Sequence, residues 1–275
     1  MKHSTPLFLG AALFAAGALL LPSASTATSV NLADGNSTAS VDLDGSAGMN
    51  SWTVDGQNQL NQQWFWYRIG NTIAQPINSI GTASVLYSDA NSLVAEYDAG
   101  GWTLDISYIL SGGGAGNADI TETIMVNNNT GSDLDFHLYQ YSDFNLLNNP
   151  AGDTAALSLV GPGSGWDNAV QWKGTTQIAE AITDPAATHG EVNFYNNTLV
   201  KLGSVPGLVL DDSMDYAGPG DVTWALQWDK LITDGASLDI FKDKKLSIEF
   251  IPEPSALALA LVGLGSLGLA RRRSR

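Results

Sequence analysis

The sequence predicts an all-β fold, a large antiparallel β-sandwich, for the middle of this chain of 275 residues. Only 15% of the residues are charged while aromatic residues are plentiful, a mixture typical of exported β-rich domains. Short apolar and β-branched runs with period-2 alternation recur, and turn residues separate them at intervals of roughly ten positions. The middle of the chain shows neither an amphipathic helix nor a repeat of fixed period.

The alternation places the expected strands. They lie at residues 63–69, 84–87, 93–97, 102–110, 119–126, 134–141, 192–195, 222–228 and 246–250. Roughly 12 to 15 strands are expected in total, in a sandwich that extends to the super-sandwich type. The Gly-rich stretch 112–117 joins two strand-like runs and has no helix after it, so it is a hairpin tip rather than a phosphate-binding loop. Residues 127–133 are likewise a turn.

The charge of the exported domain limits the partners that we expect. Residues 28–250 hold 27 acidic and 7 basic residues, a net charge near −20. Nucleic acid is therefore not an expected partner, because phosphate binding needs a basic surface. The expected reason for this negative charge is that it keeps an exported domain soluble. The alternative is that the acidic residues bind a divalent cation such as Ca²⁺. The chain has no Cys, so packing must supply its stability without disulfides.

The N-terminus has the pattern of a secretory signal peptide. Lys2 precedes an apolar run at residues 6–21, and small residues follow Pro22. We expect cleavage after Ala27, which makes residues 1–27 the signal peptide and residues 28–250 the exported domain.

The C-terminus has three parts. Pro252, Glu253 and Pro254 precede sixteen uncharged, mostly apolar residues, and Arg271, Arg272 and Arg273 follow them. As a helix, residues 255–270 would be about 24 Å long, at the short limit of a transmembrane span. The Arg cluster would stay cytoplasmic. The two prolines would leave an extended segment that a processing enzyme in the membrane can reach.

This tail, residues 251–275, resembles the PEP-CTERM sorting signal of Gram-negative bacteria. The resemblance implies that Pro252, Glu253 and Pro254 are recognised by exosortase, a membrane enzyme that cuts near this motif, after export through the secretory translocon. It also implies an inner-membrane intermediate, then the cell surface or extracellular matrix, and an association with extracellular polysaccharide and biofilm. Residues 62–68, 101–108, 139–144 and 218–224 are similar to exported proteins with the same tail, a similarity that supplies no catalytic residue.

Glu122 is the most suggestive carboxylate in the exported domain. It shares a strand face with Ile120 and Ile124, and a carboxylate on an apolar face is either paired or functional. The expected partner is Arg68, the single early cation. An ion pair, a binding role and a catalytic role all remain open for Glu122.

A second candidate is a polar and aromatic strand face. Asp135, His137, Tyr139, Tyr141 and Asp143 alternate onto one side of the expected strand at 134–141 and its extension. Aromatic rings stack on sugars while carboxylates bind their hydroxyls. Trp228 lies in a Trp row that either fills the core or binds a ligand.

The sequence contains few residues in patterns that are typical of catalysis. Thiol chemistry is excluded, and only His137 and His189 lie outside the signal peptide. Neither a Gly-x-Ser-x-Gly elbow nor His spacing for a metal is present. The Asp-rich stretches 42–46 and 211–215 are candidate Ca²⁺ loops, although neither matches the EF-hand pattern.

Three functions follow from these observations. The first is a non-catalytic surface or matrix protein that serves as a structural or polysaccharide-binding module. The second is a carbohydrate-active enzyme of the super-sandwich type, and the third is a calcium-dependent adhesin.

Overall fold

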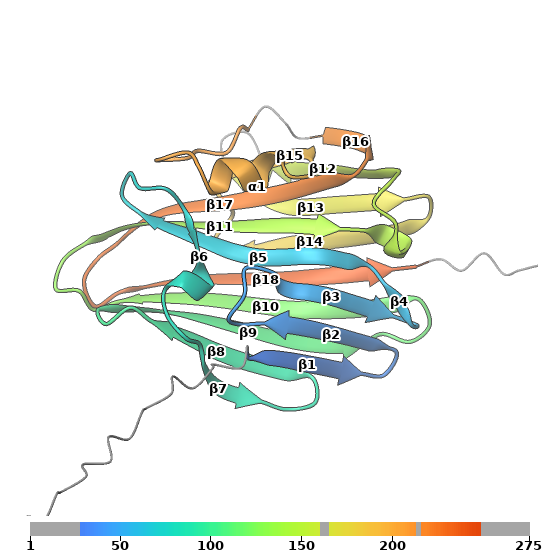
Figure 1. Cartoon of the computed structure of the whole chain (residues 1–275), viewed down its shortest axis with the longest axis horizontal. Coiled ribbons are helices and arrows are strands. Elements are labelled where there is room, and N and C mark those ends of the chain that lie inside the picture. The colour runs from blue at the N-terminus through green and yellow to red at the C-terminus, as the bar shows by residue number, and fades with distance from the viewer. Residues whose placement is uncertain (1–27, 160–164, 213–215, 249–275) are drawn as a thin grey trace, which may run out of the picture.

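The computed structural model describes residues 28–159, 165–212 and 216–248, which form two nine-stranded sheets packed face to face (Figure 1). Sheet I runs in the order β1 (Ser29–Asp34), β2 (Ser37–Asp42), β3 (Gly48–Val54), β5 (Leu60–Ile69), β11 (Leu134–Phe144), β17 (Val222–Ile232) and β15 (His189–Phe194), with β4 (Gln57–Asn58) beside β3 and β6 (Gln75–Pro76) beside β5. Sheet II runs β16 (Tyr216–Gly220), β12 (Asp153–Leu159), β13 (Trp166–Lys173), β14 (Thr176–Asp184), β18 (Ser237–Ser247), β10 (Asn117–Asn128), β9 (Trp102–Gly112), β8 (Ser92–Asp98) and β7 (Ser84–Ser88).

The predicted fold class is confirmed. All neighbouring strands pair antiparallel except β3 and β5. The described residues form more strands than the sequence predicted, and no predicted range corresponds to β1 to β4, β6, β12 to β14 or β16. The hairpin tip at residues 112–117 is confirmed by the β9–β10 pairing. A short helix, α1 (Asn197–Leu202), was missed, because six residues are too few for a periodic pattern.

Several predictions fall outside the described residues: the signal peptide at 1–27, the membrane helix at 255–270 and the Arg cluster. Within the part of the chain that the structure describes, no helix is both long and apolar enough to span a bilayer.

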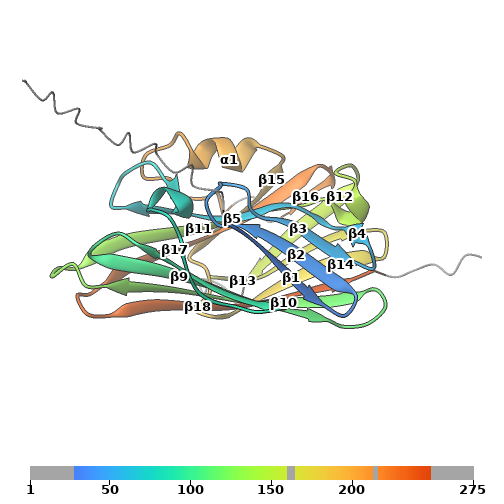
Figure 2. The ribbon, with the colours of Figure 1, turned by 60° about the horizontal axis from the view of Figure 1, so that its bottom comes forward.

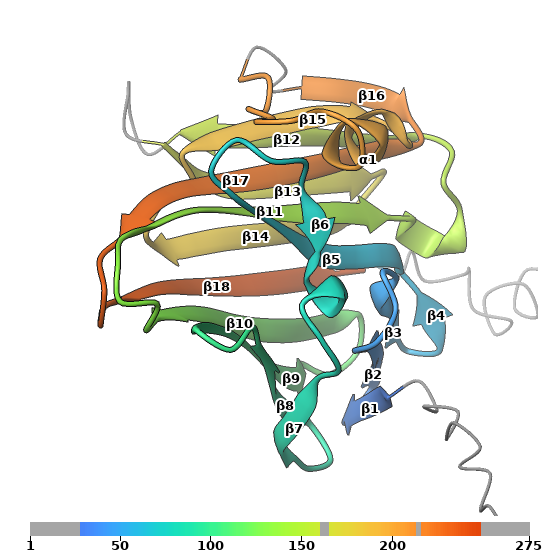
Figure 3. The ribbon, with the colours of Figure 1, turned by 60° about the vertical axis from the view of Figure 1, so that its left-hand side comes forward.

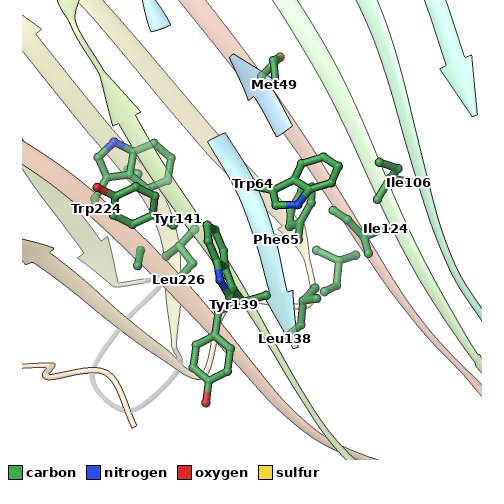
Figure 4. Close-up of a cluster of buried hydrophobic side chains, with 14 of the residues drawn as sticks. Met49, Trp64, Phe65, Ile106, Ile124, Leu138, Tyr139, Tyr141, Trp224 and Leu226 are labelled. Carbon is green, nitrogen blue, oxygen red and sulfur yellow. The ribbon is translucent and has the colours of Figure 1, made fainter. Parts of the chain in front are cut away.

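Period-2 alternation builds the core between the sheets. On β9, the residues that alternate onto one face, Trp102, Leu104, Ile106, Tyr108 and Leu110, are all buried. Figure 4 shows how Ile106 and Ile124 of sheet II lie near Phe65 and Leu138 of sheet I. The sheet twist brings β1 against β9, where Gly112 N donates to the Asp34 carboxylate at 2.9 Å.

The outer face of sheet I, which faces away from sheet II, lies under two segments of chain (Figures 2 and 3). Residues 70–80, with β6 and the short helix η1 (Ile77–Ser79), cross β5, and residues 195–212, with α1, cross β15 and β17. The two segments join where Gly207 N donates to Thr72 O at 2.9 Å and where Ile73 bridges Pro206. We call these two segments together the cover. A third short helix, η2 (Leu146–Asn148), follows β11.

Candidate functional site

Five of the residues selected from the sequence lie together on the outer face of sheet I. Arg68 of β5 pairs in register with His137 of β11, and Tyr139, Tyr141 and Asp143 follow on the same face of β11. Their side chains meet because both strands alternate and their register aligns Trp66 with Tyr139 and Trp64 with Tyr141. The fold therefore assembles the polar and aromatic face that the alternation of residues 134–141 predicts.

The aromatic centre of this face is closed. Trp64, Trp66, Tyr139 and Tyr141 are at most 5% exposed. Trp66 and Tyr141 contact edge to face with ring centroids 6.0 Å apart, and Trp64 Nε1 donates to Asn78 Oδ1 in the cover at 3.2 Å. These rings are packed against the cover rather than presented to solvent.

Polar side chains of the face bind the backbone of the cover. Tyr139 OH donates to Leu208 O at 2.6 Å, and the same hydroxyl accepts from Arg68 Nε at 2.7 Å. Gln227 of β17 accepts from Leu210 N at 2.9 Å. Because buried polar groups need partners, these bonds fix the path of residues 208–210 over the sheet.

Glu191 of β15 is a second anchor of the cover. Its carboxylate accepts from Thr198 Oγ1 at 2.6 Å and from Asp211 N at 3.1 Å, and it forms an ion pair with Lys201. Burial alone would raise the pKa of Glu191, but hydrogen bonds from Asn193, Lys201 and Thr198 outweigh burial and lower it. Glu191 is therefore an ionised group that holds α1 in place.

Alternating imidazoles and carboxylates occupy one end of the face. His137 Nδ1 contacts Asp229 Oδ1, and His189 Nε2 lies 3.4 Å from Asp229 Oδ2. His189 Nδ1 continues the series to Asp212 of the cover at 2.7 Å. Burial would raise the pKa values of Asp229 and Asp212, but hydrogen bonds, including those with the histidines, lower both. Sequence analysis missed this cluster because it began the expected strand at residue 192, whereas β15 begins at His189.

Asp143 lies at the opposite end of the face. It is 1% exposed, its Oδ2 accepts from Asn61 at 2.8 Å, and its Oδ1 has no hydrogen-bond partner among the described residues. Burial, with the nearby charges of Asp221 and Asp153, raises its pKa to about 6 against the opposing bond from Asn61. Asp143 is thus a buried carboxyl group whose Oδ1 is an unused acceptor.

The exposed Tyr195 adjoins Asp221, whose charge acts on Asp143. Tyr195 follows the end of β15, is 49% exposed, and its backbone N donates to Asp221 O at 2.8 Å. Phe194, the last residue of β15, lies beside Gly220 of sheet II, on the opposite side of sheet I from Asp143. Burial raises the pKa of Tyr141, and the charges of Asp143 and Tyr195 add to that effect. We call Asn61, Asp143, Asp221 and Tyr195 the Asp143 end of the face.

Glu122 and Trp228 do not belong to this face. Trp228 points between the sheets, where its Nε1 donates to Pro185 O at 2.9 Å. Glu122 also points into the core, as expected, but the predicted pairing with Arg68 is wrong. Its partners are Lys242 at 2.6 Å and Lys244 at 2.5 Å, which β18 turns inward.

The Asp-rich stretches serve as turns in the described residues. Asp42 Oδ1 accepts from Asp44 N and Gly45 N at 3.1 and 3.0 Å, which is the bonding of an Asx turn. Asp212 binds Gly190 N and Trp166 Nε1, and residues 213–215 lie outside the described part. Among the described residues, no group of three or more His, Asp or Glu side chains is arranged to hold a metal ion.

The two sheets and the terminal motif define the class of this protein: an exported β-sandwich with a C-terminal sorting signal. Residues 250–274 match the family of the PEP-CTERM protein-sorting motif, which confirms the resemblance seen in the sequence. The motif implies processing by exosortase, export, and a cell-surface or extracellular location. Comparison with curated protein sequences finds no match.

Solved structures share the sandwich. A bacterial glucoamylase bound to acarbose aligns with a TM-score of 0.58 at 10% identity, over 86% of this chain and 36% of that one. A protein assigned as an aldose 1-epimerase from Escherichia coli K12 aligns at 0.55 and 11%, over 82% of this chain and all of the other. A galactose mutarotase-like protein from Lactobacillus casei aligns at 0.53 and 10%, over 80% and 100%. At these identities the likeness shows the fold alone.

Proposed function

We propose that this chain is a non-catalytic surface or extracellular-matrix protein whose β-sandwich binds polysaccharide. The sorting motif supports its delivery to the cell surface, and the names of the solved structures with the same fold support a sugar as the ligand. Before processing, residues 255–270 hold the chain in the inner membrane, where exosortase acts at Pro252, Glu253 and Pro254.

The Asp143 end of the face is the observation that carries the choice of ligand. A buried carboxyl group with an unused oxygen costs free energy unless a partner supplies a hydrogen bond. A sugar hydroxyl supplies such a donor, and the neighbouring Asn61 amide fixes its direction. The exposed ring of Tyr195 offers an apolar surface on which a sugar ring stacks.

A binding role is favoured over cleavage by the cover. Tyr139, Gln227 and Glu191 bond to the backbone of residues 208–211, so the cover separates this part of the face from a polymer, whereas cleavage needs groups on both sides of a glycosidic bond. Of the other residues proposed from the sequence, Arg68, His137, Tyr139 and Tyr141 then support the site from beneath the cover, and Glu122 and Trp228 support it from the core.

The experiment is a binding assay of the full chain on bacterial and algal polysaccharides. Asp143→Asn keeps the shape of the side chain and removes its charge, and we expect binding to weaken roughly 10- to 100-fold, the value of a hydrogen bond to a charged group. Asp119→Asn is the matched control, because Asp119 is a partly buried carboxyl group on sheet II whose pKa is also raised to about 6. Binding that is equal in both variants and the wild type would remove the Asp143 end from the proposal.

A carbohydrate-active enzyme is the second candidate, and the His137–Asp229–His189 cluster favours it. Two imidazoles on one carboxylate provide groups that can donate and accept protons. Turnover of a sugar that disappears in both His137→Gln and His189→Gln variants would support this candidate. Cleavage or epimerisation of a bound glycan by the wild type would replace the non-catalytic proposal.

A further inference from the structure

Four charged side chains form a closed ring in the core between the sheets. Glu122 of β10 contacts Lys242 and Lys244 of β18, and Glu180 of β14 contacts the same lysines at 3.2 and 3.3 Å. Each of the four is at most 1% exposed. The ring is neutral overall, which is the arrangement that a buried set of charges requires.

The amide of Gln140 closes the ring from sheet I. Lys242 Nζ contacts Gln140 Oε1, and Gln140 Nε2 donates to Glu180 Oε2 at 2.9 Å and contacts Ser142 Oγ at 3.0 Å. The ring of Phe65 lies on another side of the amine, 4.9 Å from Lys242 Nζ to its centroid. An amine, an amide and two carboxylates therefore meet among side chains that are at most 1% exposed.

We propose that Lys242 and Gln140 form an intramolecular isopeptide bond, a covalent link between β18 of sheet II and β11 of sheet I. The geometry gives each group a separate role. Lys242 Nζ is the nucleophile, Glu122 at 2.6 Å is the base that takes its proton, and Glu180 bonds the nitrogen that must leave.

The step balances without a cofactor. Lys242 gives one proton to Glu122, and its lone pair attacks Cδ of Gln140 to form the new N–C bond. The C–Nε2 bond then breaks, and the second proton of the amine reaches Nε2 through the carboxyl groups, so that neutral ammonia leaves. Glu122 or Glu180 keeps the first proton. The site passes from two opposite charge pairs to one pair, with Lys244 facing the remaining carboxylate, and it stays neutral throughout.

The pKa directions define the resting state. Burial would raise the pKa of Glu122, but the two ammonium groups hold it low. Burial would lower the pKa of Lys242, but Glu122 and Glu180 raise it. The charged form is thus favoured before reaction, and proton transfer to Glu122 is the uphill part of the step. Exclusion of water protects the amide from hydrolysis while the reaction proceeds.

The test is peptide mapping of the full, folded chain after prolonged incubation, with a protease that cuts after acidic residues. We expect a linked peptide that contains Gln140 and Lys242 and whose mass is lower than the sum of its two parts by one ammonia. Mapping at the peptide level separates this product from ring closure at an asparagine, which also releases ammonia. The two peptides found separately at full mass would overturn the proposal.

Labelling of lysines in the denatured protein gives an independent readout. An amine-acylating reagent should modify every lysine of the described domain except Lys242 in the wild type. Gln140→Leu removes the amide and should restore labelling of Lys242, and Glu122→Gln removes the base and should restore it in folded protein. Lys245→Arg, an exposed change on the same strand, should leave the link intact. Full labelling of Lys242 in the wild type also overturns the proposal, whether or not the variants fold.

Discussion

Asp143 shows how one buried side chain makes stability depend on pH. Its pKa of about 6 lies above the ordinary value of 3.8, so between these pH values the folded protein binds more protons at this site than the unfolded chain does. Stability from this group therefore falls as pH rises from about 4 to 6, and the full penalty is present above pH 6. A shift of this size corresponds to about 3 kcal/mol.

Asp143→Asn should remove that penalty. We expect the free energy of unfolding of the variant, relative to the wild type, to rise by about 3 kcal/mol between pH 4 and pH 7, because the amide does not ionise. Chemical denaturation at several pH values measures the difference. A wild-type minus variant difference that stays constant over this range would show that the carboxyl group is not desolvated as the structure indicates.

Lys244 of the buried ring offers a direct test of how far the ring contributes to stability. Burial lowers the pKa of Lys244 and the charge of Lys242 lowers it further, although Glu122 and Glu180 oppose the shift, so the two carboxylates do not fully compensate for desolvation of this ammonium group. Lys244→Met should cost about 3–5 kcal/mol, since a buried carboxylate then lacks its counter-ion. Lys245→Met, at the next and exposed position, should change the free energy of unfolding by less than about 0.5 kcal/mol. Similar effects of the two substitutions would contradict the ring.

The junction of β3 and β5 depends on a glycine. Gly48 has φ of +59°, and a Cβ there would lie 2.0 Å from Cε3 of the fully buried Trp64. Gly48→Ala should therefore cost about 2–5 kcal/mol through strain and overpacking. Gly56→Ala, in a turn with φ of +79° and open space around it, should cost only about 1–2 kcal/mol, the penalty of the left-handed backbone. Thermal unfolding of the two variants would separate these effects.

The cover depends on one carboxylate. Glu191→Ala removes the acceptor of Thr198, Lys201 and the Asp211 amide, and we expect amides of residues 197–211 to exchange faster by the equivalent of about 2–3 kcal/mol. The strands of sheet II should keep their protection. Because hydrogen bonds hold the pKa of Glu191 low, this anchoring persists at neutral pH and is lost only as pH falls below the ordinary range of glutamate. Asp133→Asn, in an exposed turn, is the control.

The alternation of residues predicted which face of a strand a side chain occupies better than it predicted which other side chains it contacts. It correctly placed Glu122 on the core side of β10 and His137, Tyr139, Tyr141 and Asp143 on one face of β11. The partner of Glu122 was missed because the last predicted strand began at residue 246, whereas β18 starts at Ser237 and points Lys242 inward. The meeting of His189 with Asp229 follows from the pairing of β15 with β17, an order of strands that local sequence does not encode.

At the scale of the molecule, the two ends and the middle carry different kinds of information. The sorting tail is a short linear motif, so its residues and their order suffice to identify it. The function of the sandwich depends on which side chains the cover leaves accessible, and the cover is built from segments far apart in sequence, residues 70–80 and 195–212. The location of the protein can therefore be predicted from a linear motif, whereas a binding site on the sandwich depends on contacts between distant segments.

The most direct test of the proposed function uses extracellular polysaccharide from cells that carry an exosortase. The full chain is titrated against this polymer, and the chain length of the polymer is measured before and after incubation. The account predicts saturable binding that Asp143→Asn weakens, with the polymer length unchanged. Shortening of the polymer, or binding that is indifferent to Asp143, would contradict it.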